Sequence, residues 1–164
     1  MWRSRGLVLQ PQVAWRADMF KRILIATDGS ELAEKAVVQG LDLASELRVE
    51  VVVLTVVEPW WIRNRGWWIP PQPVIEAYER SAEQSAARMT NHVMDVAKEK
   101  QIRCSAMHIK GSAPADGIIE GAKQSGCDLV IMSSHGRGGL GRLLLGSVAA
   151  EVLVRSTIPV LICR

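Results

Sequence analysis

The chain has little of the residue type that builds disulfide scaffolds and metal centres. Among its 164 residues there are only three cysteines, Cys104, Cys127 and Cys163. They are odd in number, far apart, and form neither a CxxC pair nor a Cys/His ligand spacing. The sequence therefore predicts reduced thiols, a cytoplasmic location, and neither a disulfide framework nor a zinc site.

Long apolar runs and a strong charge of one sign are also missing. No run reaches the roughly 18 apolar residues expected of a membrane span, so we expect no transmembrane segment. Near the start, Gln10, Pro11 and Gln12 interrupt the apolar residues, which makes a poor secretory signal. The net charge is only +3, without a dense basic stripe or an interleaved aromatic platform, which argues against nucleic-acid binding.

What the chain does contain is an alternation of short apolar runs and helical periods. The runs contain β-branched residues and are continuous, as expected for parallel strands that are buried on both faces. Strands are expected at residues 21–26, 50–58, 102–109, 128–132 and 158–163, with apolar residues at helical spacing between them. This pattern predicts an α/β fold: a doubly wound, Rossmann-like five-stranded parallel sheet with helices on both faces.

Two stretches lie outside this alternation. Residues 1–18 have no clear period, and we expect an irregular N-terminal extension, or upstream sequence, before a single domain over residues 19–164. Residues 59–73 are an insert rich in proline and tryptophan that holds four of the six tryptophans. Two interpretations of the insert stay open. It forms an exposed surface for a partner or a membrane, or it folds back over the second long helix or a dimer surface.

Glycine is concentrated between the fourth strand and the last helix, in residues 133–147. Glycines allow the backbone to approach a ligand closely, and the free N–H groups of a helix start attract anions. The stretch matches neither the P-loop nor the dinucleotide-binding pattern. It indicates phosphate binding, and the alternative is a connector in which Ser147 is an ordinary helix N-cap.

Three candidate residues follow three different strands. Asp28 comes just after the first strand, Val56 stands near the end of the second, and Ser133 follows the fourth. In open α/β sheets, ligands bind outside the carboxyl ends of the strands at the point where the strand order reverses. We therefore expect all three residues to meet at one crevice.

Several separated blocks, in the right order, resemble the universal stress protein family over about residues 19–164. The blocks are Lys21–Ser30, Gly111–Ala115, Ser134–Gly139, Leu144–Val148 and Pro159–Leu161. The resemblance implies strand order 3-2-1-4-5 and a homodimer formed through the C-terminal strand. It also implies a role in stress response through a protein partner that the sequence does not define.

The ATP-binding branch of that family carries the pattern G-x2-G-x9-G-[ST]. Here Gly136 and Gly146-Ser147 match the pattern, and Ser133 stands in the place of the first glycine. The resemblance implies ATP as ligand, with Mg²⁺ as a possible companion and ADP, AMP or a cyclic nucleotide as alternatives. The candidate binding residues are Asp28, Val56, Ser133, His135, Gly136, Arg137, Gly139, Gly146 and Ser147.

Within this set, Asp28 would accept hydrogen bonds from the ribose or adenine region, and otherwise caps the first helix. Val56 would pack on adenine, and otherwise belongs to the core. The glycines and Ser147 would donate to phosphates. His135 and Arg137 could contact or neutralise phosphates, and otherwise serve the loop or remain solvated.

The sequence offers little for catalysis. No Walker lysine follows the glycines, and no second acidic residue is clearly placed to hold a metal. We expect an ATP-binding stress-response regulator or sensor that acts as a homodimer, with little or no catalytic turnover. One alternative is a dimeric interaction protein of the same family that binds no nucleotide, which Ser133 favours. The other alternative is a weak ATP-hydrolysing enzyme.

Overall fold

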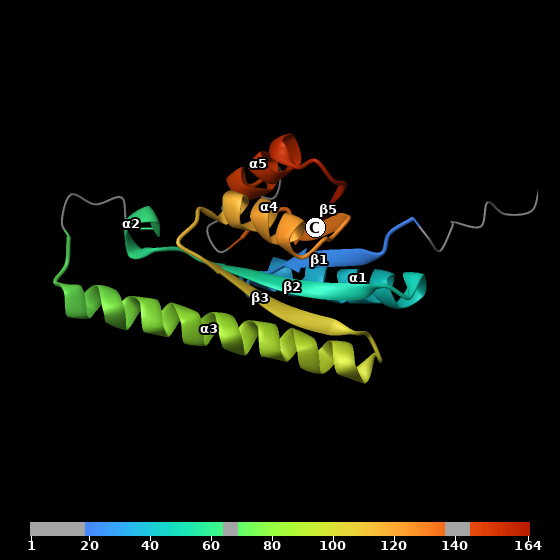
Figure 1. The fold of residues 1–164 in the computed structure, drawn as a ribbon, viewed down its shortest axis with the longest axis horizontal. Coiled ribbons are helices and arrows are strands. Elements are labelled where there is room, and N and C mark those ends of the chain that lie inside the picture. The colour runs from blue at the N-terminus through green and yellow to red at the C-terminus, as the bar shows by residue number, and fades with distance from the viewer. Residues whose placement is uncertain (1–18, 64–68, 137–144) are drawn as a thin grey trace, which may run out of the picture.

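The computed structural model describes residues 19–63, 69–136 and 145–164, and within them strands and helices alternate along the chain (Figure 1). In chain order the elements are β1 (Arg22–Ala26), α1 (Glu31–Leu47), β2 (Glu50–Val57), α2 (Trp60–Arg63), α3 (Gln72–Glu99), β3 (Cys104–Lys110), α4 (Pro114–Gln124), β4 (Leu129–Ser133), α5 (Ser147–Arg155) and β5 (Val160–Cys163).

The five strands form one parallel sheet in the order β3-β2-β1-β4-β5. The predicted fold class and strand order are both confirmed. The order reverses at β1, because the chain first builds outward through β2 to β3 and then returns to add β4 and β5 on the other side. This reversal opens a crevice at the carboxyl ends of β1 and β4.

Two apolar cores lie on the two faces of the sheet. Alternate residues of a strand point to opposite faces, so Ile23 and Ile25 pack with α1 and α3, whereas Leu24 packs with α4 and α5. In Figure 1, α3 runs along one side of the sheet, and α4 and α5 lie on the other. Because both faces are covered, the inner strands β1, β2 and β4 are mainly apolar and buried, whereas the edge strand β3 carries exposed polar residues.

The structure departs from the predicted elements in two ways: all five strands have bounds that differ by one or two residues, and one short helix is added. The third strand was expected from residue 102 but begins at Cys104. The reason is the end of α3, where Gln101 takes a left-handed conformation with φ 59° and Ile102 donates to the carbonyl of Ala97. Because this turn at the end of α3 includes Ile102, β3 can only begin after it. The second difference is α2, a single helical turn inside the proline- and tryptophan-rich insert that the sequence pattern did not predict.

The three cysteines are free thiols at buried or half-buried positions. Burial raises the pKa of all three thiols, Cys104, Cys127 and Cys163. A raised pKa leaves less of the reactive thiolate near neutral pH. In the parts of the chain that the structure describes, no helix is long and apolar enough to cross a membrane.

A buried hydroxyl joins α3 to the edge strand β3. Thr90 is fully buried, and its Oγ1 lies 3.1 Å from the carbonyl oxygen of Ala86 and 2.9 Å from Nε2 of His108. Thr90→Val keeps the branched shape and removes the hydroxyl. We expect it to lower the free energy of unfolding by about 1 kcal/mol, the usual net value of such a hydrogen bond. The measurement is the urea unfolding midpoint at constant m-value.

The double variant Thr90→Val/His108→Ala serves as the control for this prediction. If the hydroxyl acts through the imidazole, the double variant will lose less stability than the sum of the losses in Thr90→Val and His108→Ala. An unchanged midpoint in Thr90→Val would show that the contact adds nothing to stability.

Candidate functional site

A cavity of about 650 Å³ lies at the carboxyl ends of β1, β2 and β4. Its walls come from the β1–α1 turn, the end of β2, the part of α3 between Tyr78 and Met89, the start of α4, the end of β4 with the residues after it, and the start of α5. The volume is in the range of ligand pockets, and the position is the one that the reversal of strand order predicts. Of the predicted residues, the cavity brings together Asp28, Val56, Ser133, His135, Gly136, Gly146 and Ser147.

Asp28 connects the β1–α1 turn with the glycine-rich stretch. Its Oδ1 accepts a hydrogen bond from the amide of Ser30 at 3.0 Å. The cap of α1 is Ser30 itself, whose Oγ accepts from the amide of Ala33, so the alternative role of Asp28 as helix cap is not adopted. Its Oδ2 lies against Gly136, where an added Cβ would be 2.6 Å from that oxygen. Only glycine fits there without displacing the carboxylate.

Ser133, in the place of the first glycine of the motif, is the last residue of β4 and is buried. Its hydroxyl donates to the carbonyl oxygen of His135 at 2.7 Å, and Oγ of Ser134 lies 3.1 Å from Nδ1 of that histidine. Ser133 is not among the described residues with positive φ. The serine therefore costs no backbone strain, and its hydroxyl supports the turn that leaves the sheet.

Gly146 brings the start of α5 against the end of β4. Its amide donates to the carbonyl oxygen of Ser134 at 2.8 Å, and a Cβ added at Gly146 would lie 2.8 Å from that same oxygen. The expectation that this amide donates to phosphate is therefore replaced by a role in close packing. Gly146 is also the N-cap, and Ser147 is the first residue of the helix. The interpretation of Ser147 as an N-cap was wrong.

The first turn of α5 supplies amide donors that no carbonyl within the helix accepts, whereas the amide of Gly146 already donates to Ser134. The first amides of a helix have no acceptor within the helix, and the helix dipole places partial positive charge there. Ser147, Val148 and Ala149 occupy this turn, and all three line the cavity. This wall of the cavity is suited to a phosphate or another anion.

The opposite end of the cavity is mainly apolar. Val56 is half-buried near the end of β2, and its side chain points to α4, where it contacts Gly117. Ile118 lines the cavity beside it, and the carboxylate residue Glu58 follows on the same strand end. Val56 thus lines the cavity and packs against the core, and its contact with adenine stays a prediction.

Two candidate residues, Arg137 and Gly139, lie outside the residues that the structure describes. Among the described cavity-lining residues the ionisable side chains are Asp28, Glu58, Tyr78 and His135, and no lysine or arginine is included. Positive charge for a phosphate is supplied within the described ranges by the amides of α5.

Sequence reasoning missed the wall that α3 contributes. Tyr78, Ser81, Ala82, Ser85 and Met89 all line the cavity. Tyr78, Ala82 and Met89 recur at the same helical spacing as residues of a core-facing stripe. The spacing alone does not distinguish a face that covers a sheet from one that borders a cavity.

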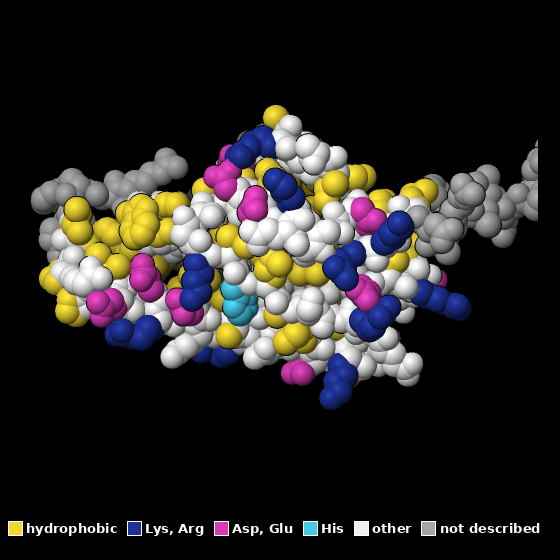
Figure 2. Space-filling model, in the orientation of Figure 1, with side chains coloured by type: hydrophobic (Ala, Val, Ile, Leu, Met, Phe, Trp, Pro, Cys, Tyr) yellow, Lys and Arg dark blue, Asp and Glu magenta, His cyan; other side chains and the backbone are white. Residues whose placement is uncertain are grey.

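The proline- and tryptophan-rich insert is described in part. Hydrophobic side chains gather over α2 and the start of α3 (Figure 2). Helix α2 packs against α3, with Trp60 half-buried and Trp61 62% exposed. The half-buried position of Trp60 agrees with the interpretation that the insert folds back over the second long helix, α3. A partner surface at Trp61 stays a prediction.

Comparisons of the sequence and of the structure with known proteins point to the same family. A sequence model described as the universal stress protein family matches residues 19–164. Universal stress protein YxiE of Bacillus subtilis is 30% identical over 149 residues, which cover 89% of this chain and all of that protein. The solved structure of MJ0577 from Methanocaldococcus jannaschii superposes with a TM-score of 0.72 at 27% identity, covering 88% of this chain and 96% of that one. A universal stress protein in complex with cAMP has a TM-score of 0.65 at 24% identity, covering 88% and 97% of the respective chains.

Proposed function

Because the chain belongs to the universal stress protein family, we propose that it binds an adenine nucleotide, with ATP as the expected ligand, in the cavity at the carboxyl ends of β1, β2 and β4. The observation that carries this proposal is the contact between Asp28 and Gly136 beside the first turn of α5. One cavity thereby combines a carboxylate acceptor for ribose hydroxyls with amide donors for phosphate oxygens.

The phosphates lie at the first turn of α5. Backbone amides and the helix dipole bind phosphate without a lysine, as in other anion sites at helix starts. Gly136 and Gly146 act by allowing close approach, since each has a polar oxygen within 2.8 Å of the position that a Cβ would occupy. Arg137, Gly139 and the hydroxyl of Ser147 are further proposed phosphate contacts.

The nucleoside lies at the end of the cavity formed by β2, α3 and α4. Val56 and Ile118 present apolar surface to the base, and Asp28 is placed between them and the phosphate end. The complex of a related universal stress protein with cAMP supports an adenine nucleotide as the class of ligand. That complex also keeps a cyclic nucleotide among the alternatives to ATP, together with ADP and AMP.

The biological role that we propose is nucleotide-controlled regulation or sensing in the stress response, in the cytoplasm, by a homodimer joined through β5. The bound nucleotide acts as a signal, with little or no turnover, and a protein partner of unknown identity receives it. Mg²⁺ is expected to accompany a triphosphate through its phosphate oxygens.

The first test is to denature the purified protein with acid and to identify the released small molecules by mass spectrometry. The second is to titrate ATP, ADP, AMP and cAMP in a thermal-shift assay with and without Mg²⁺. A ligand at about 100 times its Kd adds about 2.7 kcal/mol of stability when it binds only the folded state. Released adenine nucleotide or a saturable shift supports the proposal. Absence of both would favour the non-binding dimeric interaction protein, and sustained phosphate release would favour the ATP-hydrolysing enzyme.

A further inference from the structure

A second cavity lies at the amino end of the edge strand β3, at the opposite end of the sheet from the proposed nucleotide site. It has a volume of about 430 Å³. Its lining comes from the last two turns of α3, from the turn at residues 101–103 and from Cys104, the first residue of β3. Figure 1 shows the end of α3 beside the start of β3. The volume is in the range of pockets that bind small molecules.

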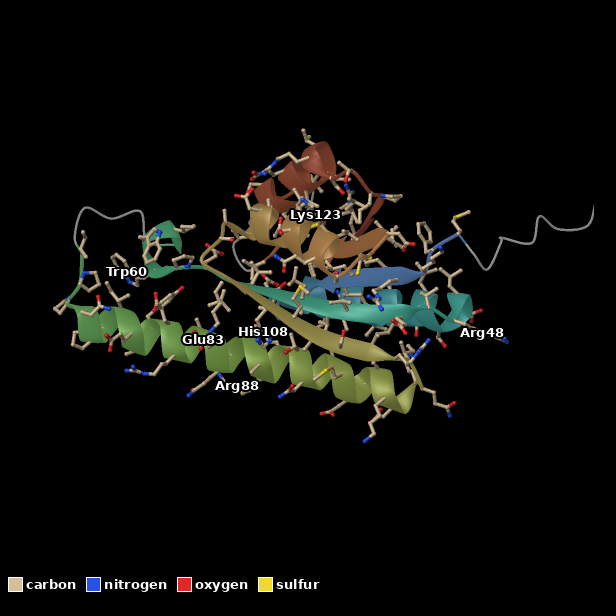
Figure 3. All side chains as sticks on the ribbon, in the orientation of Figure 1. Arg48, Trp60, Glu83, Arg88, His108 and Lys123 are labelled. Carbon is tan, nitrogen blue, oxygen red and sulfur yellow. The ribbon has the colours of Figure 1, made fainter. Side chains whose placement is uncertain are left out.

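The way α3 is attached to β3 explains where this second cavity opens. Two polar contacts hold the helix to the carboxyl half of the strand: Glu83 pairs with Lys110 at 2.7 Å, and Thr90 contacts His108 at 2.9 Å. Figure 3 shows Glu83 and His108 between α3 and β3. Toward the start of the strand, the residue on the same face is Ala106, which contributes only a methyl group. The helix and the strand therefore leave space between them at that end.

The floor of the second cavity is apolar. Met94, Ile102 and Cys104 are half-buried, line the cavity and pack against the apolar core on the α1 and α3 side of the sheet. Met94 has an unbranched, polarisable side chain that adapts to the shape of a ligand. Burial raises the pKa of the Cys104 thiol, so that near neutral pH this side chain remains an uncharged part of the floor. The floor therefore favours contact with a hydrocarbon chain or an aromatic ring.

The rim of the second cavity carries an excess of positive charge. Lys98 and Arg103 are exposed and line it, against a single carboxylate residue, Asp95. The guanidinium group of Arg103 lies 2.9 Å from the carboxylate of Glu50, and the same carboxylate lies 2.6 Å from the guanidinium group of Arg22. One carboxylate thus faces two guanidinium groups. The charge of Arg103 is therefore only partly compensated, and an anion at the rim is attracted to it.

The backbone at the end of α3 adds little negative charge to oppose an anion. The partial negative charge at the end of a helix resides on carbonyl groups that lack a hydrogen-bond donor. Here the carbonyl oxygens of Val96, Ala97 and Lys98 all accept hydrogen bonds from amides of the turn that follows. Nearby, Lys100 and Asp42 form an ion pair at 2.6 Å, so their charges offset each other. The side chains of the rim therefore decide which charge the second cavity prefers.

We propose that the second cavity binds a small apolar anion, a carboxylate carried on a short hydrocarbon chain or an aromatic ring. The apolar body lies against Met94, Ile102 and Cys104, and the carboxylate contacts Lys98 and Arg103. A guanidinium group is suited to this contact because its fork of N–H donors matches the two oxygens of a carboxylate. The inference does not depend on nucleotide binding, because the two cavities share no lining residue.

The test follows the methyl signals of the methionines of the full chain by NMR while octanoate is added as the probe, below the concentration at which it forms micelles. Met94 lines the second cavity and Met89 lines the first, so each cavity has its own reporter. The variants Met94→Leu and Met89→Leu assign the two signals. We expect a saturable shift of the Met94 signal and an unchanged Met89 signal. A Met94 signal that does not move would overturn the proposal.

Two comparisons test whether the ligand must be an anion. Octan-1-ol keeps the hydrocarbon chain of octanoate without its charge, and Lys98→Gln removes a cation from the rim while keeping a helix-favouring side chain. We expect the dissociation constant from the Met94 shift to rise about fivefold or more in each comparison. The control is Lys123→Gln, an exposed position of α4 outside both cavities, which should leave the constant for octanoate unchanged.

The remaining outcomes contradict the proposal in different ways. If octan-1-ol binds as tightly as octanoate, or if Lys98→Gln binds octanoate as tightly as wild type, the rim does not select an anion and the proposed ligand class is wrong. If the Met94 signal shifts with protein concentration in the absence of octanoate, the second cavity is an interface between copies of the chain. Since the wild-type chain alone supplies the octanoate and octan-1-ol results, the test holds even if a variant does not fold.

Discussion

Gly146→Val is expected to raise the dissociation constant for an adenine nucleotide by more than about 100-fold, which corresponds to about 2.7 kcal/mol of binding free energy. The cause is steric, because the backbone angles at Gly146, φ −62° and ψ 151°, are accessible to any residue. An added Cβ would lie 2.8 Å from the carbonyl oxygen of Ser134 and 3.4 Å from Cα of His135.

Both of these neighbours are backbone atoms at the end of β4 and cannot rotate away. The substituted chain must therefore break the hydrogen bond from the amide of residue 146 to Ser134 and displace the start of α5. Since the first turn of α5 carries the proposed phosphate donors, this displacement removes the anion site. The measurement is calorimetric titration, with circular dichroism to show that the fold is retained.

Gly126→Ala is the matched control for this prediction. Gly126 lies in the turn between α4 and β4, away from the cavity, with φ +64° and no neighbour within 4 Å of an added Cβ. Alanine there costs roughly 1 kcal/mol because of the left-handed backbone, and the nucleotide affinity should not change. A folded Gly146→Val protein that binds as tightly as wild type would remove Gly146 from the site.

Charged substitutions on the β5 edge are expected to convert a homodimer into a monomer. The sheet has two edge strands of different character. On β3 the exposed positions include Ser105, His108 and Lys110, and such polar and charged residues protect an edge from pairing. On β5, Leu161 is 42% exposed, and on the preceding helix Val154 is 85% exposed. An apolar edge of this kind is suited to a second copy of the chain.

The double variant Val154→Asp/Leu161→Lys places a charge at both of these positions. By light scattering after size-exclusion chromatography, we expect wild type at about twice the chain mass of 18.1 kDa and the variant at that mass itself. A lysine on an edge strand opposes pairing, and buried unpaired charge is costly in an interface.

Ala106→Lys on the opposite edge is the control, because it adds the same charge to an exposed position of β3. It should leave the mass of the dimer unchanged. A monomeric wild-type chain, or a double variant that remains dimeric, would contradict the proposed dimer through β5.

Most of the strands could be predicted from the sequence because they are apolar runs between turn residues, and the edge strand β3 is the exception. The first strand was expected at residues 21–26 and lies at Arg22–Ala26. The start of α4 was also predictable, since Pro114 is tolerated in the first turn of a helix and occupies that place. These features depend on residues close together in the chain, where local chemistry decides the conformation.

The partners of individual polar groups could not be predicted. The hydroxyl of Ser133 bonds to the carbonyl of His135, and the amide of Gly146 bonds to Ser134. Both bonds depend on how the chain turns as it leaves β4, which the residue types do not specify. The motif indicated that small residues are needed there, but it did not show which of them face a ligand and which pack against backbone.

By itself, the sequence of this protein determined the alternation of strands and helices, because burial on both faces of a parallel sheet requires continuous apolar runs. It also determined that a glycine-rich connection follows β4. Only the tertiary structure decided that Asp28 touches Gly136 and that α3 borders the cavity. The physical reason is that both depend on the packing of segments far apart in the chain, and the helical period is the same whether a face covers a sheet or a ligand.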